Sequence, residues 1–201
     1  CLIISSSTRQ STLIRHIWPD SSLIRTVLLA SIGSLLLVVS AKVQVPFWPV
    51  PMTMQTFVVL VLAIAYGPRL GTVTVALYLF EGAVGLPVFA KGGGLAYFSS
   101  PTGGYLIGFL VAAWTVGWLA ERGWDRSVVT TALAMLIGEV VIFAFGLAWL
   151  GWFIANAKGL PLMAGYKAAI AAGVTPFLLA EAFKILLATV TVPLIWKRLR
   201  P

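Results

Sequence analysis

Residues 128–154 read VVTTALAMLIGEVVIFAFGLAWLGWFI, a stretch in which Glu139 is the only charged side chain. An α-helix needs about 20 mainly apolar residues to cross a bilayer, so this stretch predicts a membrane-spanning helix. The whole chain has the same character, because 60% of its 201 residues are hydrophobic and 10% are charged. Soluble domains carry about 25% charged residues. The composition therefore excludes an ordinary soluble enzyme and predicts an all-α, polytopic membrane protein.

Five further apolar stretches accompany this one, and together they predict a bundle of six transmembrane helices. The six predicted spans are residues 23–41, 54–66, 70–84, 104–120, 128–154 and 171–196. The second and third spans are short for a full crossing, which predicts tilted or irregular helices there. We expect the bundle, residues 23–196, to form one transmembrane domain. Residues 1–22 precede it as an N-terminal segment, and residues 197–201 follow it as a basic tail.

Positively charged residues orient this bundle in the membrane. An even number of spans puts both ends of the chain on one side, and that side then holds all eight arginines. These are Arg9, Arg15, Arg25, Arg69, Arg122, Arg126, Arg198 and Arg200. Lys and Arg concentrate in cytoplasmic loops of membrane proteins. We therefore expect a plasma (inner) membrane protein with both termini in the cytoplasm, and we attribute the net charge of +8 to topology rather than to nucleic-acid binding.

The two outward loops differ from ordinary connectors. Residues 42–55 contain three prolines, which fix the backbone φ angle and stiffen the loop, and they present Phe47 and Trp48. Residues 85–104 are rich in glycine and are long for a connection within a compact bundle. Irregular, apolar loops on one face predict a lid or a lining over a pocket.

Buried charges mark a candidate site in the last span. An ionised carboxylate at the centre of a membrane costs on the order of 3 kcal/mol on insertion scales, and Glu181 lies in that span with Lys184 three residues later. Positions i and i+3 share a helix face, so the two residues form either a structural ion pair or a contact with a ligand. Thr53 and Gln55 offer neutral hydrogen bonds, and Lys91 offers a cation in the glycine-rich loop.

Small residues form a face on the first span, where Ala30 and Ser34 flank Gly33. Such faces let helices approach closely in lipid. The face serves either packing within the chain or contact with a partner membrane protein. A second stripe, formed by Gly104, Gly108 and Ala112, predicts internal packing of the fourth span.

Several kinds of chemistry are excluded. The sequence holds one cysteine, Cys1, and one histidine, His16, which removes a disulfide framework and a cysteine-based metal site. The glycines at 92–94 are not followed by the Lys-Ser/Thr pair of a phosphate-binding loop. The sequence also lacks a Gly-x-Ser-x-Gly elbow and a His-Glu-x-x-His motif. We therefore predict no enzyme activity, no cofactor and no metal for this chain.

Four motifs in fixed order resemble the BioY family, the biotin-specific S components of energy-coupling-factor (ECF) transporters. They are QVPFWPVPMTMQ at 44–55, YGPRLG at 66–71, GLPVFA at 85–90 and SPTGGYLIGF at 100–109. The resemblance implies six helices and a biotin pocket near the outer face. It also implies partners that supply energy, namely a transmembrane T component and two cytoplasmic ATPase subunits.

The resemblance extends to the last span with substitutions. The family often carries Pro-Gly-Asp-x-x-Lys after a Pro-Phe, whereas residues 176–184 of this chain read PFLLAEAFK. Lys184 matches, and Glu181 replaces the aspartate. Leu179 and Ala180 replace the Pro-Gly pair. A carboxylate is thus retained, but its side chain is one methylene longer. It also lies on a helix that lacks the Pro-Gly interruption.

Biotin fits the residue types that this chain offers. A carboxylate such as Glu181 accepts hydrogen bonds from the ureido N–H groups, and Gln55 or Thr53 completes the polar shell. The apolar thiophane ring and valerate chain suit the aromatic residues Phe47, Trp48, Phe89 and Tyr97. Lys91 or Lys184 would meet the biotin carboxylate. The alternative is a stand-alone secondary transporter of a small organic acid that uses Glu139 and Glu181 as a proton relay.

Overall fold

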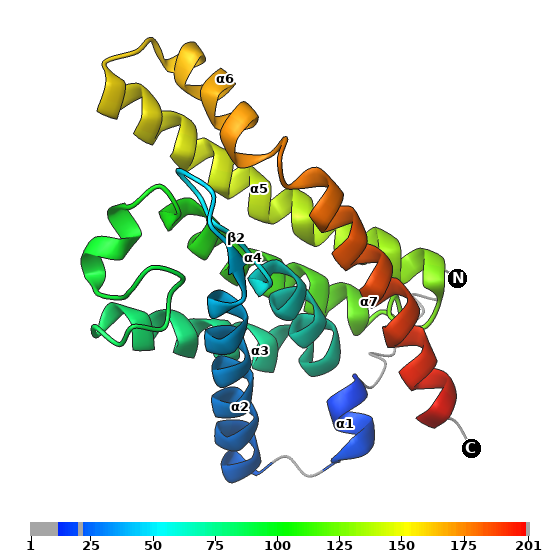
Figure 1. Cartoon of the computed structure of the whole chain (residues 1–201). Coiled ribbons are helices and arrows are strands. Elements are labelled where there is room, and N and C mark those ends of the chain that lie inside the picture. Colours follow the sequence, from blue (N-terminus) through cyan, green and yellow to red (C-terminus); the bar gives the residue numbers. More distant parts are fainter. Residues whose placement is uncertain (1–11, 20–21, 200–201) are drawn as a thin grey trace, which may run out of the picture.

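The computed structural model describes residues 12–19 and 22–199 of the chain as a bundle of helices (Figure 1). Five helices are long and apolar enough to cross a membrane. The elements in order are α1 Leu13–Ile17, α2 Leu23–Lys42, β1 Gln44–Val45, β2 Met52–Thr53, α3 Gln55–Ala83, η1 Leu95–Ser99, α4 Gly103–Ala120, α5 Val128–Lys158, α6 Leu162–Gly173 and α7 Leu178–Leu199. The predicted all-α membrane fold is confirmed.

Helix α3 contains the second and third predicted spans, because it turns back on itself at Gly67. This glycine has φ +79°, which interrupts the helix directly before Pro68. The Gln55 Nε2 atom donates a hydrogen bond of 2.8 Å to the Tyr78 Oη. A straight helix would separate these two residues by about 34 Å. The two halves of α3 are therefore antiparallel neighbours. The predicted path of six crossings is retained with five long helices, because α3 supplies two of the crossings.

Sequence features fix the ends of the long helices. The Ser22 and Ser127 hydroxyls accept hydrogen bonds from the backbone N–H groups of Arg25 and Thr130, which caps the starts of α2 and α5. Helix α5 ends at Gly159, whose φ of +61° suits a glycine C-cap. These caps fix ends of α2 and α5. The two loops of the candidate site lie between these helices in the sequence.

Close helix contacts depend on the small residues. A Cβ atom on Gly104 would lie 2.4 Å from the Trp149 Cβ, and one on Gly108 would lie 3.0 Å from the backbone of Ile142. The predicted stripe on the fourth span therefore packs α4 against α5. Ala30 and Ser34 on α2 are also buried within the chain, where the Ser34 hydroxyl donates to the Glu81 carboxylate of α3. The face proposed as a partner interface is thus occupied by internal packing in this structure.

The end of the chain differs from the prediction. A single span was expected over residues 171–196, but the helix is interrupted between Gly173 and Leu178, where Pro176 disfavours a helical residue before it. The additional helix α6 runs back along α5 before α7 begins (Figure 1). A Cβ atom on Gly165 would lie 2.4 Å from the Gly151 carbonyl oxygen, so this contact requires glycine. The interruption brings Phe177 and the first turn of α7 to the candidate site.

The bundle has two chemically different ends. At one end the β1–β2 hairpin and the loop with η1 meet, because the Lys42 ammonium donates to the Phe89 carbonyl at 2.7 Å and the Gln44 amide donates to the Ala90 carbonyl at 3.1 Å. We call this the cavity end. The other, the arginine end, holds α1, the turn of α3 and the α4–α5 loop. Six of the eight arginines predicted to share a face are described; Arg9 and Arg200 lie outside the described residues.

Candidate ligand-binding site

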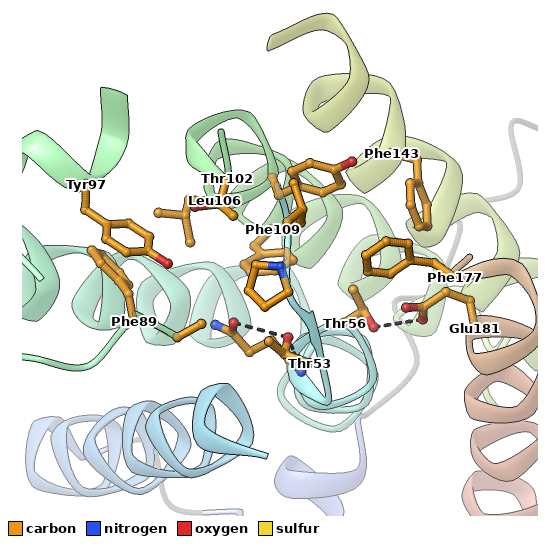
Figure 2. Close-up of a pocket in the computed structure, with 15 residues that line it drawn as sticks. Thr53, Thr56, Phe89, Tyr97, Thr102, Leu106, Phe109, Phe143, Phe177 and Glu181 are labelled. Carbon is orange, nitrogen blue, oxygen red and sulfur yellow. Dashed lines mark hydrogen bonds between the residues drawn. The ribbon is translucent and has the colours of Figure 1, made fainter. Parts of the chain in front are cut away.

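A cavity lies beneath the two loops at the cavity end, with about 530 Å³ of empty space including its open mouth. Its walls come from the hairpin, α3, the η1 loop, α4, α5 and the start of α7 (Figure 2). The lining residues are Val50, Pro51, Thr53, Gln55, Thr56, Phe89, Ala90, Tyr97, Thr102, Tyr105, Leu106, Phe109, Phe143, Phe177 and Glu181. The lining is mainly aromatic and aliphatic, with a few polar groups, which is typical of small-molecule sites.

One polar corner of the cavity is centred on Glu181, which is 5% exposed. The Thr56 hydroxyl donates to its Oε2 at 2.9 Å, and the Lys184 ammonium forms an ion pair with its Oε1 at 2.8 Å. The same ammonium donates to the Thr53 carbonyl at 2.6 Å and to the Thr56 hydroxyl at 3.0 Å. The three protons of Lys184 therefore reach oxygens of the chain itself, so the buried charge is compensated.

The second polar group of the cavity is the side chain of Gln55, the first residue of α3. The Gln55 amide nitrogen donates to the Tyr78 Oη, which in turn donates to the Val88 carbonyl at 3.2 Å. The Thr53 hydroxyl donates to the Gln55 amide oxygen at 3.3 Å. These bonds fix the orientation of the Gln55 amide at the cavity wall.

Aromatic rings form the apolar walls. Phe89 is buried and packs edge-on against Tyr78, with ring centroids 5.4 Å apart. Its ring also packs against that of Tyr97, with centroids 4.7 Å apart and the planes tilted by 33°. On the opposite side Phe177 packs against Phe143 at 6.5 Å and against Phe47 at 6.1 Å. The space between these walls is therefore flat-sided and apolar, with the Glu181 corner at one edge (Figure 2).

The comparisons with known proteins agree with this geometry. The model of the BioY family matches residues 9–201. The chain belongs to the BioY family. The biotin transporter BioY of Thermotoga maritima is 35% identical over 165 residues, which cover 82% of this chain and 91% of that protein. A protein named as a probable biotin transporter BioY, from Pyrococcus horikoshii, is 36% identical over 147 residues, covering 73% and 80%.

A solved structure shares the fold. The crystal structure of an S-component for biotin from an ECF-type ABC transporter matches with a TM-score of 0.69 at 23% sequence identity. The match covers 87% of this chain and 92% of that one. This BioY chain is thus a multi-span membrane protein with the all-helical S-component fold.

Five of the residues predicted from the sequence of this BioY chain line the cavity together. They are Thr53, Gln55, Phe89, Tyr97 and Glu181. Lys184 lies directly behind them, where it contacts Glu181 rather than open space.

The other three predicted residues lie outside the lining. Lys91 is exposed, next to the lining residue Ala90. Trp48 is 76% exposed at the tip of the hairpin, and the Lys158 ammonium lies 5.9 Å from the centre of its ring. Phe47 reaches the site only through its contact with Phe177. The hairpin instead turns Val50 and Pro51 toward the cavity.

Sequence reasoning missed several lining residues. Thr56 follows Gln55 directly, and a helix starting there brings its hydroxyl to Glu181, so the motif at 44–55 carried a usable signal. Tyr105 and Phe177 lie within quoted motifs but were not assigned to the site. Phe109 ends the motif at 100–109 and was likewise not assigned. Phe143 lies in a mainly apolar helix, where nothing in the sequence separates a ring that lines a cavity from one that faces lipid.

Glu139 on α5 lies behind the polar corner. Its side chain is buried, and neither carboxylate oxygen has a hydrogen-bond partner among the described residues. It is within electrostatic range of Glu181 and Lys184. Within residues 12–19 and 22–199, no cluster of three His, Cys, Asp or Glu side chains is arranged to hold a metal ion.

Proposed function

We propose that this BioY chain is the biotin-capturing S component of an ECF vitamin-uptake transporter. The supporting observation is the buried Glu181–Lys184–Thr56 corner at the edge of an aromatic cavity, in a chain whose relatives carry the name biotin transporter. A neutral ring with two N–H donors matches a carboxylate at such an edge. Biotin is then the transported substrate, and no cofactor takes part in its capture.

Each part of biotin has a counterpart in the cavity. The ureido N–H groups would donate to Glu181, and the amide of Gln55 with the hydroxyl of Thr53 would complete the polar shell. The thiophane ring and valerate chain would lie between the Phe89–Tyr97 wall and the Phe177 wall. Polar groups left without partners cost about 1–3 kcal/mol each, which favours this vitamin over vitamins of different shape.

The two candidate lysines receive different roles. The Lys184 ammonium already donates to Glu181, Thr53 and Thr56, so it would hold the carboxylate in place and balance its charge. Lys91 is exposed beside Ala90, at the edge of the cavity. We therefore assign the biotin carboxylate to Lys91 at the mouth.

The transport cycle requires partners. We propose that the chain resides in the plasma (inner) membrane with both termini in the cytoplasm, because positively charged residues favour that side. A transmembrane T component and two cytoplasmic ATPase subunits would supply the energy, since the sequence contains no phosphate-binding loop. The cavity end would then face outward.

Equilibrium binding of biotin to the purified chain in detergent tests the proposal, with thiamin and riboflavin as control ligands. Selective binding of biotin without ATP or partner subunits is the expected result. Absence of binding in a sample with intact helical circular dichroism would contradict it. The Lys91→Met variant should weaken biotin binding more than that of biotin methyl ester, whereas wild-type protein should prefer the free acid.

Glu139 supports a second candidate function. A buried carboxylate without a hydrogen-bond partner, close to Glu181, is the arrangement expected of a proton relay. The chain would then be a secondary transporter of a small organic acid. Uptake into cells that express this chain without T component or ATPase subunits, abolished by a protonophore and by Glu139→Gln, would favour the relay over the ECF subunit.

A further inference from the structure

A second pocket lies at the arginine end, away from the cavity between the two loops. It has about 940 Å³ of empty space including its open side. Its lining is Ile14, Arg15, Pro19, Arg25, Thr26, Tyr66, Arg69, Leu70, Val73 and Glu121. Arg15, Arg25 and Arg69, from three different elements, thus line one pocket. Glu121 is the one carboxylate among the described lining residues. The proposed function gives this pocket no task.

Defined contacts build the wall that carries Arg15. Thr12 and Leu13 are both buried, and a Cβ atom on Gly67 would lie 2.9 Å from the Thr12 Cγ2, so α1 rests directly on the turn of α3. The Arg25 Nη2 atom donates to the Ile14 carbonyl at 3.1 Å, which ties the start of α2 to α1. These contacts hold α1 against the start of α2 and against the turn of α3, and so define this wall of the pocket.

The surroundings of the pocket are those expected at the depth of the lipid headgroups. Helix α2 begins at Leu23, and the adjacent side chains of Leu23 and Ile24 are 81% and 72% exposed, as expected where a helix enters hydrocarbon. Trp18, which lies 5.9 Å from the Arg25 guanidinium, is also partly exposed. Tryptophan next to basic residues is typical of the membrane interface.

The lining combines charge with apolar surface. Arg15 and Arg69 are exposed at the opening, and guanidinium groups bind phosphate oxygens in a bidentate manner. Ile14, Leu70 and Val73 form the apolar part, and Val73 is 50% exposed, which continues the apolar surface toward the membrane interior. A free phosphate ion would use only the arginines. An occupant with both a phosphate and an acyl chain would use the whole lining.

We infer that this pocket binds the headgroup phosphate of one anionic phospholipid from the adjacent leaflet. Arg15 and Arg69 contact the phosphate, Arg25 adds positive charge at the base, and the acyl chain follows Val73 along α3. The Tyr66 hydroxyl is engaged with the Leu29 carbonyl at 3.2 Å, so its ring rather than its oxygen forms part of the pocket. The bound lipid bridges α1, α2 and α3, and its binding is independent of biotin.

Native mass spectrometry of the full chain in detergent tests this inference, with dioleoyl-phosphatidylglycerol as the probe. The wild-type chain should retain one phosphatidylglycerol in preference to phosphatidylcholine, and the lipid should raise the unfolding temperature. Each basic residue near the surface contributes about fivefold to the binding of anionic lipid. The double variant Arg15→Gln/Arg69→Gln should therefore bind the lipid roughly 30-fold more weakly.

A matched variant separates a specific site from general attraction. Lys197→Gln/Arg198→Gln removes the same charge from exposed residues of α7 that do not line the pocket, and it should lose clearly less lipid affinity than Arg15→Gln/Arg69→Gln. Equal loss in both double variants would overturn the inference. Equal retention of phosphatidylcholine would also overturn it, as would the same stabilisation by inorganic phosphate at the lipid's concentration. If Arg15→Gln/Arg69→Gln does not fold, Arg69→Gln alone should still show about a fivefold loss.

Discussion

The two ends of the bundle differ in whether their charged side chains are buried in ion pairs or exposed. At the cavity end, Glu181 and Lys184 pair with each other and with Thr56 inside the protein. At the arginine end, Arg15 and Arg69 remain exposed around an open pocket. Charges that are paired internally can orient a neutral polar group such as a ureido ring, whereas exposed cations attract an anion. The difference underlies the two distinct ligands that we propose for the two ends.

The largest expected effect comes from Glu181→Ala, which leaves the Lys184 ammonium buried without its carboxylate. Breaking a buried ion pair by removing one partner costs about 3–5 kcal/mol. We expect a lower unfolding temperature and loss of biotin binding, measured by tryptophan fluorescence on heating and by isothermal titration calorimetry.

A second variant separates stability from binding. Glu181→Leu/Lys184→Met removes both charges, and replacing a buried pair by apolar groups is often neutral for stability. We expect this double variant to regain most of the lost unfolding temperature but still not to bind biotin. Wild-type affinity in the double variant would show that Glu181 has only a structural role.

Gly67→Ala should have the next largest effect, at the arginine end. At Gly67, φ is +79° and ψ is 179°, a region essentially restricted to glycine, where another residue costs about 1–3 kcal/mol. The new Cβ would also crowd the Thr12 side chain. Gly159→Ala is the control, because it has a similar positive φ with open space around it and should cost less. Thermal unfolding measures both variants. Biotin affinity should change by less than about threefold in each, and a larger change would mean that the two ends are coupled.

Asp125→Asn tests how a buried carboxylate is tolerated in the α4–α5 loop. Asp125 accepts a hydrogen bond of 2.6 Å from the Trp196 indole, and burial raises the pKa of Asp125 above its ordinary value of 3.8. The native state therefore binds the proton more tightly than the unfolded state does. The resulting stability is fully present below about pH 4 and is lost as pH rises through the raised pKa.

The amide in Asp125→Asn cannot lose this proton. We expect its unfolding temperature to fall less than that of wild type as pH rises from 4 to 7. Parallel curves for the two proteins would contradict the assignment. Glu181→Gln is not a suitable control for this pH experiment, because it also removes the ion pair between Glu181 and Lys184.

Trp48→Ala should have the smallest effect. Its side chain is mostly exposed at the hairpin tip, and exposed substitutions usually change stability by less than about 0.5 kcal/mol. We also expect biotin affinity within about twofold of wild type, measured by calorimetry. A tenfold loss would place Trp48 over the ligand and would extend the cavity end to the hairpin tip.

The fold was largely predictable because it depends on the length and apolarity of whole segments. The Gly67–Pro68 pair separated two predicted spans, which the structure joins by a turn. The interruption before α7 was missed because residues 171–196 are mainly apolar, so hydropathy alone did not reveal the effect of Pro176.

The site was predictable where chemistry is unusual for a membrane. Glu181 is conspicuous because a carboxylate is costly in hydrocarbon, and its position in the cavity agrees with that reasoning. The aromatic residues were harder to assign. Phe89 and Trp48 lie in similar apolar loops, yet one is buried in the wall and the other is exposed. That difference arises from how the hairpin is tied to the η1 loop, which is a long-range contact.

The Lys184 ammonium donates hydrogen bonds to Glu181, Thr53 and Thr56, all within the protein itself. An incoming molecule meets side chains that are already in place, so little of its interaction energy is spent on ordering them. In the proposed biotin complex, this prior order would leave more of the interaction energy for affinity.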